Sequence, residues 1–524
     1  SDFKNGVNTS GLIQYVWLFG ITGIFVLLLA CINFMNLSTA RSEKRAREVG
    51  IRKAIGSVRS QLILQFLSES VLVALFAFFF SLILAQVVLP FFNSVSDKHM
   101  NIMWTSPVFW LAGIGFSLLT GLIAGSYPSL YLSSFDPVKV LKGTFRAGRF
   151  AAMPRKVLVV LQFSVSVTLI IGTIIVFRQV QFAKNLPIGY NRAGMIELGI
   201  NTPELSNNYN VLRDELMRSG GVYDMSESSG SVTVQYGGTT NISWREKPPE
   251  AHPLLMSNNV TIDYGRTVGW QVKEGRDFSR TFATDSAAMI LNEAAVQTMG
   301  FKNPVGEQVK LGSNSFNVIG VIHNMIKENP FAPVSPSYFI LNYGGVNTIN
   351  IKLTPQLSTR DALTKVEKVF KKFNPASLFV YNFVDEEYAK KFGYEERIGK
   401  LAAFFATLAI FISCLGLFGV ASFVAEQRTK EIGVRKVLGA TVLNVWGLLS
   451  KEFILLSGFS LLISMPVAYY FMNKWLINYE YKTPLSWWIF ALAGIGVVAI
   501  TLLTVSFQAI KAAVANPVKS LRTE

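Results

Sequence analysis

Two charged stretches of the sequence carry the same residue types at the same spacing. The first reads REVGIRKAIG from Arg47, and the second reads KEIGVRKVLG from Lys430. In each, a glutamate precedes an arginine by four residues, which is the favourable order for an ion pair on one helix face. The recurring positions are Arg45, Glu48, Gly50, Arg52, Lys53 and Gly56, which return as Arg428, Glu431, Gly433, Arg435, Lys436 and Gly439. Such a face can bind a charged surface.

Two binding surfaces compete for these stretches. Anionic lipid attracts basic segments by about 1 kcal/mol for each Lys or Arg near the surface. Lipid needs only positive charge, whereas the stretches also repeat Glu48 as Glu431 and repeat their glycines. Val49, Ile51 and Ile55 add a limited apolar patch. The pattern therefore favours a specific protein partner over lipid alone.

Residue patterns for bond-breaking chemistry are absent from the sequence. The histidines are His99, His252 and His323, and the sequence has no HExxH, GxSxG or CxxC pattern and no GxxxxGK[ST] loop for nucleotide phosphates. Cys31 and Cys414 both lie in apolar runs and lack metal-binding spacing. We expect a chain that is not an enzyme and binds no metal or cofactor directly.

The elements that position the charged stretches are membrane spans. Half of the 524 residues are hydrophobic and only 16% are charged, against about 25% in soluble domains. A spanning helix needs about 20 apolar residues. Seven runs qualify, which predicts a polytopic α-helical membrane protein: Gln14–Leu37, Ser70–Phe92, Ser106–Leu130, Val157–Phe177, Lys400–Val424, Trp446–Met472 and Ser486–Phe507.

The net charge of +16 is concentrated beside these spans. Residues 39–60, 133–156, 425–446 and 508–524 hold fourteen of the sixteen excess positive charges. They follow the first, third, fifth and seventh spans, so the positive-inside rule places them and the C-terminus in the cytoplasm. This distribution argues against nucleic acid as a partner. The segment of about 220 residues between spans four and five then lies outside, and its turn signals and short β-branched runs predict one mixed α/β domain.

The spans form an internal repeat. Residues 31–85 align with residues 414–468 at a constant offset of 383, and LAGIG at Leu111 returns at Leu492. Spans one to three and five to seven are therefore two parallel copies of one three-helix module, with one extra helix between them. Within the copies, Glu69 returns as Glu452, for which we expect helix-packing or partner contacts near the membrane surface. DPVKVL at Asp136 returns as NPVKSL at Asn516, and we expect each proline motif to end a helix.

Together these features resemble the MacB/FtsX-type ABC transporter permeases. The charged stretches resemble those of two FtsX-like permease domains. The outer segment is similar to the MacB-like periplasmic core domain through EGRDFS at Glu274, LNEAAVQTMGF at Leu291, NPVGEQV at Asn303 and VIGVIHN at Val318. The resemblance implies a bacterial inner-membrane permease coupled by mechanotransmission to a separate cytoplasmic ABC ATPase dimer, which would hold the ATP-Mg. The recurring residues above would then be the coupling-helix residues that contact the ATPase.

The resemblance also implies a domain plan. It divides the chain into a tail of an outer domain (1–11), a first permease module (12–143), a cytoplasmic linker with the fourth span (144–177), the periplasmic core domain (178–398) and a second permease module (399–524). A family half has one helix, an outer domain and three helices, so the resemblance implies a first helix and a first outer domain that precede Ser1.

Two functions remain open within this family. The first is export or extraction (efflux) of a peptide, lipoprotein or antibiotic-like substrate, with a periplasmic adaptor as a further partner. The second is transmembrane signalling without transport, in which the same motion switches a periplasmic hydrolase or sensor. Both use the cytoplasmic loops in the same way and differ only in the outer partner.

Overall fold

The computed structural model describes residues 3–4, 7–8, 11–96, 98–134, 153–206, 208–375 and 377–514. The chain divides into two compact units. The first comprises residues 1–178, 396–476 and 484–524, and the second comprises residues 179–395 and 477–483. The proline motifs at Asp136 and Asn516 lie outside the described residues.

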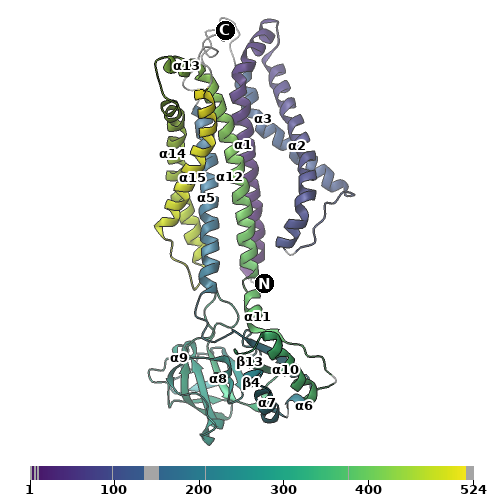
Figure 1. Cartoon of the computed structure of the whole chain (residues 1–524), viewed down its shortest axis with the longest axis vertical. Helices are drawn as coiled ribbons and strands as arrows, with labels where there is room; N and C mark the ends of the chain where they lie inside the picture. The colour runs from purple at the N-terminus through teal and green to yellow at the C-terminus, as the bar shows by residue number, and fades with distance from the viewer. Residues whose placement is uncertain are drawn as a thin grey trace. The chain divides into compact units, whose positions relative to one another are not determined.

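The first unit is built from long apolar helices (Figure 1). Among the described residues, seven helices are long and apolar enough to cross a membrane, which confirms the predicted fold class. They are α1 (Gly11–Ala54), α2 (Arg59–Ser96), α3 (Pro107–Ser133), α5 (Met153–Lys184), α12 (Gly393–Gln427), α14 (Val442–Leu476) and α15 (Trp487–Val514). Most are longer than the predicted spans, because they continue into the polar residues at their ends.

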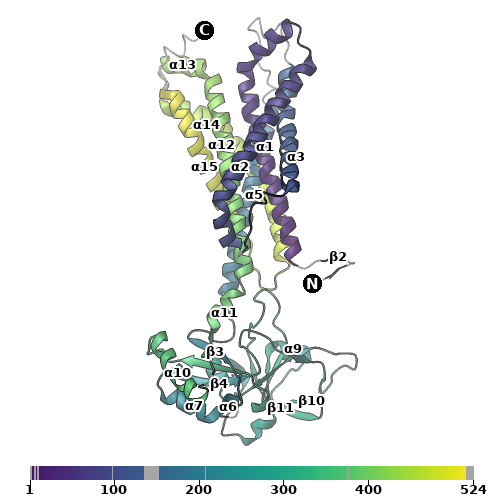
Figure 2. The same cartoon turned by 90° about the vertical axis from the view of Figure 1, so that its right-hand side faces the viewer.

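The two copies of the three-helix module lie beside each other in this unit. α2 and α3 accompany α1, and α14 and α15 accompany α5 and α12 (Figure 2). α1 contacts α12, where the rings of Phe19 and Phe405 stack with centroids 6.0 Å apart. A Cβ atom at Gly419 would lie 2.0 Å from Cδ2 of Leu37, so a larger residue there would require the Leu37 side chain to move.

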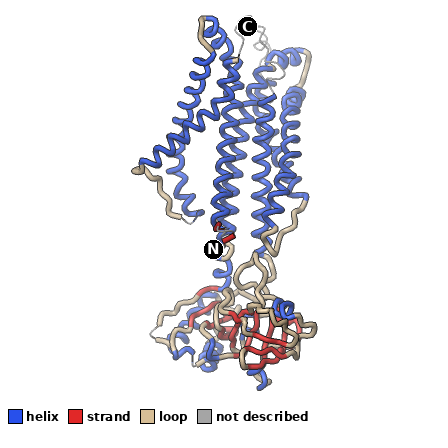
Figure 3. Tube along the Cα trace, turned by 180° about the vertical axis from the view of Figure 1, so that it is seen from behind, coloured by secondary structure: helices blue, strands red, loops and turns tan. Residues whose placement is uncertain are grey.

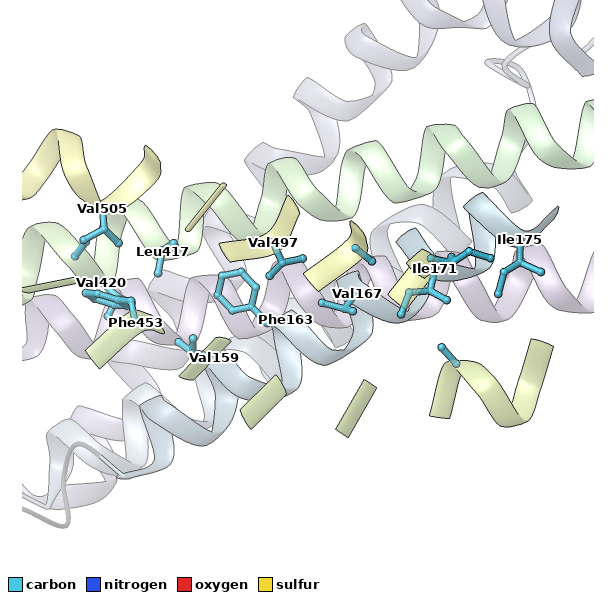
Figure 4. Packing of buried hydrophobic residues seen from close by; sticks show 14 of the residues in the cluster. Val159, Phe163, Val167, Ile171, Ile175, Leu417, Val420, Phe453, Val497 and Val505 are labelled. Atoms are coloured by element: carbon cyan, nitrogen blue, oxygen red, sulfur yellow. The ribbon is translucent and has the colours of Figure 1, made fainter. Parts of the chain in front are cut away.

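α5 packs only against the second copy in the main core of this unit. Buried Val159, Phe163, Val167, Ile171 and Ile175 of α5 meet side chains of α12, α14 and α15 (Figure 4). Two polar contacts fix the helix in register. The Oγ atoms of Ser166 and Ser413 are 2.8 Å apart, and Ser164 Oγ donates to Ser460 O at 3.3 Å. Interhelical contacts of this kind suit a membrane interior, where apolar surface alone drives little helix association.

The second unit holds a mixed β-sheet, drawn in red in Figure 3. Its strands follow the order β14-β3-β13-β4-β7-β12-β9-β11-β10-β6, with β5 beside β7 and β8 beside β11. β9 with β11 and β7 with β12 are parallel pairs, and the other pairs are antiparallel. The strands are β3 (Met195–Gly199), β4 (Val222–Ser228), β5 (Gly238–Thr239), β6 (Ile242–Trp244), β7 (Leu255–Val260), β8 (Val272–Gly275), β9 (Ala288–Asn292), β10 (Gln308–Leu311), β11 (Asn314–Ile322), β12 (Ser337–Leu341), β13 (Thr348–Leu353) and β14 (Asn382–Phe383).

Helices cover the sheet in two places. α7 (Tyr209–Arg218) and α10 (Thr359–Phe373) pack on β3, β4 and β13, and α9 (Glu293–Met299) packs in a second core around β9 and β11. α10 begins where Ser358 Oγ accepts from the Asp361 amide at 3.1 Å, a standard N-cap. The remaining short elements are β1 (Phe3–Lys4), β2 (Val7–Asn8), α6 (Pro203–Ser206), α8 (Tyr264–Val268), η1 (Ala283–Ala287), η2 (Tyr343–Gly345), α11 (Val384–Lys390) and α13 (Thr429–Val437).

The loop between α14 and α15 belongs to the sheet unit, although the sequence-based plan places it within the second permease module (399–524). Gln179 Nε2 donates to Tyr481 O at 2.7 Å, and the Thr483 amide donates to Gln179 Oε1 at 2.8 Å. The rings of Phe331 and Tyr479 meet edge to face with centroids 5.3 Å apart. These contacts join residues about 300 positions apart, so no local pattern could have revealed them.

Candidate functional site

The first charged stretch is the exposed end of α1. Glu48 and Arg52 form the predicted i,i+4 ion pair, with Oε1 and Nη2 2.8 Å apart. Arg52 Nη1 also donates to Gln65 Oε1 on α2 at 2.5 Å. Lys53 Nζ donates to the carbonyl of Ser133 at 2.7 Å, at the end of α3. The stretch is therefore held by both other helices of its module.

The second charged stretch forms the separate helix α13. Glu431 and Arg435 repeat the ion pair at the same distance of 2.8 Å. Arg428, which precedes α13, contacts Glu452 on α14, with Nη2 and Oε2 3.4 Å apart. Glu452 also accepts from Lys156 Nζ of α5 at 2.6 Å. The expectation that Glu452 makes helix-packing contacts is thus confirmed. In the first copy, Gln65 Nε2 donates to Glu69 Oε1 at 3.4 Å.

Both stretches end in the same turn. The amide of Gly56 donates to Lys53 O, and that of Ser57 to Arg52 O. Gly439 and Ala440 make the same two bonds to Lys436 O and Arg435 O. This pair of bonds is the Schellman motif, which needs a left-handed residue after the helix. Gly56 has φ +105° and Gly439 has φ +90°, which explains why glycine recurs there.

The other recurring glycines do not mark such a turn. Gly50 lies inside α1 and Gly433 inside α13, and both are buried. Only the second copy has a break between the spanning helix and the loop helix, at Arg428, because α1 continues unbroken to Ala54. Arg45 lies in α1, but its side chain is outside the described part of the chain.

The apolar residues of each stretch divide into an inner and an outer set. Val49 and Ile432 are buried against the other helices of their modules. Ile55 is 81% exposed, and Leu438, its counterpart at offset 383, is 80% exposed. Ile51 and Val434 are also exposed, at 46% and 49%. Leu438 and Val434 were not singled out from the sequence, although their register in the repeat would have identified them.

The shared geometry makes the two stretches candidate surfaces for binding a protein. An exposed i,i+4 ion pair adds only about 0.2–0.5 kcal/mol to a helix, so stability alone gives little reason to build it twice. Each pair lies one turn from a large exposed apolar side chain and a rigid turn. Such a combination of an apolar anchor and fixed charges is typical of a docking face. The described residues contain no group of three or more side chains that could hold a metal ion.

The sheet unit contains two buried ionisable groups, Lys327 and Glu227, that sequence reasoning did not single out. Burial lowers the pKa of Lys327 to about 8, and its Nζ donates to Asn258 Oδ1 at 2.5 Å. Burial raises the pKa of Glu227 to about 8, and neither of its carboxylate oxygens has a hydrogen-bond partner. His323 follows β11, with Nδ1 3.3 Å from Glu293 Oε1. These groups stand apart from the two charged stretches in the sequence.

Two family models match the chain. The FtsX-like permease C-terminal model matches residues 20–137 and 403–517, so it is found twice, as the repeat predicts. The MacB-like periplasmic core domain model matches residues 157–369. A membrane protein with two permease modules around one such domain is therefore an ABC-type permease. The chain belongs to the MacB/FtsX-type ABC transporter permeases, and the resemblance seen in the sequence is confirmed.

Individual relatives resemble only part of the chain. The Macrolide export ATP-binding/permease protein MacB of Bdellovibrio bacteriovorus is 29% identical over 145 residues, which is 27% of this chain and 21% of that protein. The Uncharacterized ABC transporter permease YknZ of Bacillus subtilis is 30% identical over 119 residues, 22% of this chain and 28% of that protein. The matches thus span less than a third of these relatives' lengths.

Solved structures were also found for the outer domain. The periplasmic region of MacB from Actinobacillus actinomycetemcomitans aligns with 40% of this chain and 97% of that chain, at 14% identity and a TM-score of 0.30. The extracellular domain of the YknZ transporter from Gram-positive bacteria aligns with 36% of this chain and 97% of that chain, at 15% identity and a TM-score of 0.27.

The domain boundaries and the docking residues stay predictions.

Proposed function

We propose that this chain is the transmembrane subunit of an ABC-type export machine and that its two charged stretches bind a cytoplasmic ATPase dimer. ATP-Mg binds and is hydrolysed on that separate ATPase, and this chain transmits the resulting motion through its spans to the outer domain. The stretches and the C-terminus then lie in the cytoplasm. The substrate is a peptide, a lipoprotein or an antibiotic-like molecule that reaches the outer domain.

The observation that carries this proposal is the duplicated docking face. In Glu48–Arg52 and Glu431–Arg435 the charged atoms are the same 2.8 Å apart, the side chains are 42–54% and 44–46% exposed, and the same glycine turn follows. A partner with two equivalent halves, such as a dimer, fits two equivalent faces. One copy would suffice for a partner with a single contact surface.

Lipid anchoring is the competing explanation for the charged stretches. It differs from ATPase docking in how binding depends on net charge and on the position of each charge. Lipid attraction depends on net positive charge near the surface and is weakened by the acidic Glu48 and Glu431. Docking depends on which sign stands at which position. An exchange of the two charges within one pair leaves the net charge unchanged, so it alters only the second property.

The test uses the full chain expressed in its native membranes with its natural partners. In one variant Glu48→Arg is combined with Arg52→Glu, and in the other Glu431→Arg is combined with Arg435→Glu. Each variant keeps an i,i+4 pair of opposite charges and the same net charge, and the first exchange also removes the Arg52–Gln65 hydrogen bond. We expect each exchange to reduce the co-purifying ATPase, quantified by mass spectrometry, by at least tenfold. Undiminished ATPase in both variants would exclude these residues as the docking face.

A control separates loss of docking from loss of membrane insertion. Lys511 is an exposed basic residue near the end of α15 and belongs to neither pair. Lys511→Glu changes the net charge by two units, yet we expect the ATPase to be retained. If Lys511→Glu releases the ATPase as strongly as the exchanges do, general electrostatics explains the binding and the proposal fails.

A further inference from the structure

A pocket of about 210 Å³ opens where α5, α12 and α14 meet, at the end of the spans that carries α13. Three basic side chains line it, Arg155 and Lys156 from the first turn of α5 and Arg428 from the end of α12. The only acidic side chain among its lining residues is Glu452 of α14. Three positive charges and one negative charge leave the pocket with an excess of two positive charges.

The carboxylate of Glu452 forms ion pairs with two of the three basic side chains. Its oxygens lie 2.6 Å from Lys156 Nζ and 3.4 Å from Arg428 Nη2. Arg155 is not part of this network. Its guanidinium lies over the ring of Phe423, with 4.8 Å between the central carbon and the ring centroid, and its Nε is buried without a hydrogen-bond partner. A buried charged donor without an acceptor is costly, so the site is suited to receive an anion.

The other wall of the pocket is apolar. Val159, Val420 and Phe453 line it below the charged groups, and in Figure 4 these side chains lie together at one end of the buried cluster. Charged donors beside an apolar wall match an amphiphile, whose head is anionic and whose tail is hydrocarbon. An isolated inorganic anion would leave the apolar wall unused.

We propose that this pocket binds the headgroup phosphate of an anionic phospholipid, with the first part of an acyl chain against the apolar wall. Arginine donates to phosphate oxygens in a bidentate manner, and lysine adds a point charge. Basic pockets between membrane helices are known to select anionic headgroups. The lipid would join α5 to α12 and α14, and Glu452 would compete with the phosphate for Lys156 and Arg428.

The site belongs to the second copy only. Glu69 and Arg45 are the counterparts of Glu452 and Arg428 in the sequence, at offset 383. Arg155 and Lys156 are supplied by α5, which packs on the second copy and lies outside the repeat. The lipid site is therefore a difference between two modules that otherwise carry the same loop.

The test titrates the full-length protein in a zwitterionic detergent with short-chain dihexanoyl phosphatidylglycerol, and bound lipid is counted by native mass spectrometry. Parallel titrations use dihexanoyl phosphatidylcholine and inorganic phosphate. We expect one phosphatidylglycerol site at least tenfold tighter than any phosphatidylcholine site. Phosphate that displaces the lipid completely at equal concentration would show an anion site without lipid selectivity and would overturn the proposal.

Variants test the residues in opposite directions. Arg155→Gln and Lys156→Gln each remove a positive charge, so we expect at least fivefold weaker phosphatidylglycerol binding. Glu452→Gln removes the internal competitor, so we expect severalfold tighter binding. Lys511→Gln, at the same end of the bundle but outside the pocket, serves as the matched control and is expected to change binding less than twofold.

The Glu452→Gln variant tests the proposal even if an α5 variant fails to fold, because the proposal expects it to bind lipid more tightly and not more weakly. A purely structural ion pair predicts that Glu452→Gln lowers the unfolding temperature without tightening lipid binding, and that result would overturn the proposal. So would a loss of binding in Lys511→Gln equal to that in Arg155→Gln, because the lipid would then follow net charge alone.

Discussion

The two permease modules present the same loop on different helical supports. In the first copy, α1 runs without interruption from the span to Ala54. In the second copy, α12 ends at Gln427 and α13 begins at Thr429, after Arg428 with φ −92° and ψ 11°. The ion pair, the exposed apolar residue and the glycine turn are nevertheless the same in both. The proposed docking face therefore has the same geometry whether or not its helix is continuous with the span.

One substitution between the copies coincides with the break. The counterpart of Ala46 at offset 383 is Thr429. Thr429 Oγ1 donates to the carbonyls of Ala425 at 3.2 Å and Glu426 at 2.7 Å. Such bonds from a threonine to the preceding turn slightly destabilise helices and often bend them, whereas alanine has the highest helix propensity. Thr39 makes the same two bonds within the unbroken α1, so Thr429 is a hypothesis for the break that the last prediction tests.

The copies also differ in what covers them. Ser460 of α14 is fully buried beneath α5, whereas its counterpart Ala77 of α2 is exposed and lines an open groove of about 290 Å³. Phe116 is 54% exposed, but Val497, its counterpart at offset 381, is 4% exposed. The core of the second copy is thus covered by α5, which is the one span without a counterpart in the repeat.

The largest expected effect tests whether both faces dock. Ile55→Asp and Leu438→Asp each place a charge where an apolar anchor is exposed. Because burial of one such side chain at an interface is worth about 1.5–3 kcal/mol, each variant should weaken ATPase binding tenfold to a hundredfold. Binding of the purified ATPase to the full chain in nanodiscs measures this effect. The conservative variants Ile55→Leu and Leu438→Met should bind normally.

The two aspartate variants can also show that the two loops differ in function. Both sites are about 80% exposed, so the free energy of unfolding should change by no more than about 0.5 kcal/mol. If Leu438→Asp releases the ATPase and Ile55→Asp does not, the copies are alike in shape but not in role.

The next effect tests the difference in packing. Ser460→Phe forces an aromatic ring into the contact with α5, and overpacking of this kind costs about 1–3 kcal/mol. Ala77→Phe places the same ring at the same repeat position, in an open groove, and should leave stability unchanged. Unfolding of each full-length variant in mixed micelles by sodium dodecyl sulfate gives the comparison. Equal destabilisation of the two would mean that the groove beside Ala77 is also filled in the membrane.

The sequence predicted the features that depend on composition and on repetition. Seven apolar runs gave seven spans, and constant spacing revealed the ion pairs before their 2.8 Å distances were known. The α7 and α10 helices coincide with amphipathic patterns in the sequence at residues 208–218 and 359–373. In these cases the physical signal lies within one helix or between two repeated segments.

Features that depend on pairing between remote residues were not predictable. The parallel pairing of β9 with β11 and the contact of Gln179 with Tyr481 join segments without any shared local pattern. The length of α1 was also missed, because the basic residues after Leu37 mark the end of the apolar run but not the end of the helix. Arg155 was counted only as part of a basic stretch, since its position in a pocket depends on how α5 packs.

A smaller effect tests the feature that the copies share most closely. Gly56 and Gly439 both have φ near +100°, where a Cβ atom is strained. Gly56→Ala and Gly439→Ala should each lower stability by about 1–2 kcal/mol, and by nearly the same amount. Thermal unfolding of the full chain measures both. A Cβ would meet no atom within 4 Å at either position, so any loss comes from the backbone and not from a clash.

The smallest effect tests the cause of the helix break itself. Thr429→Ala should join α12 to α13, because it removes the hydroxyl that competes for the backbone carbonyls and raises helix propensity by about 0.5 kcal/mol. Amide hydrogen exchange at residues 428–432 should then slow about twofold. Ala46→Thr should do the reverse in α1. If Thr429→Ala leaves exchange unchanged while Arg428→Ala, which removes the contact with Glu452, slows it, then tertiary packing and not the threonine interrupts the helix, and the two copies differ for a reason that lies outside the loop.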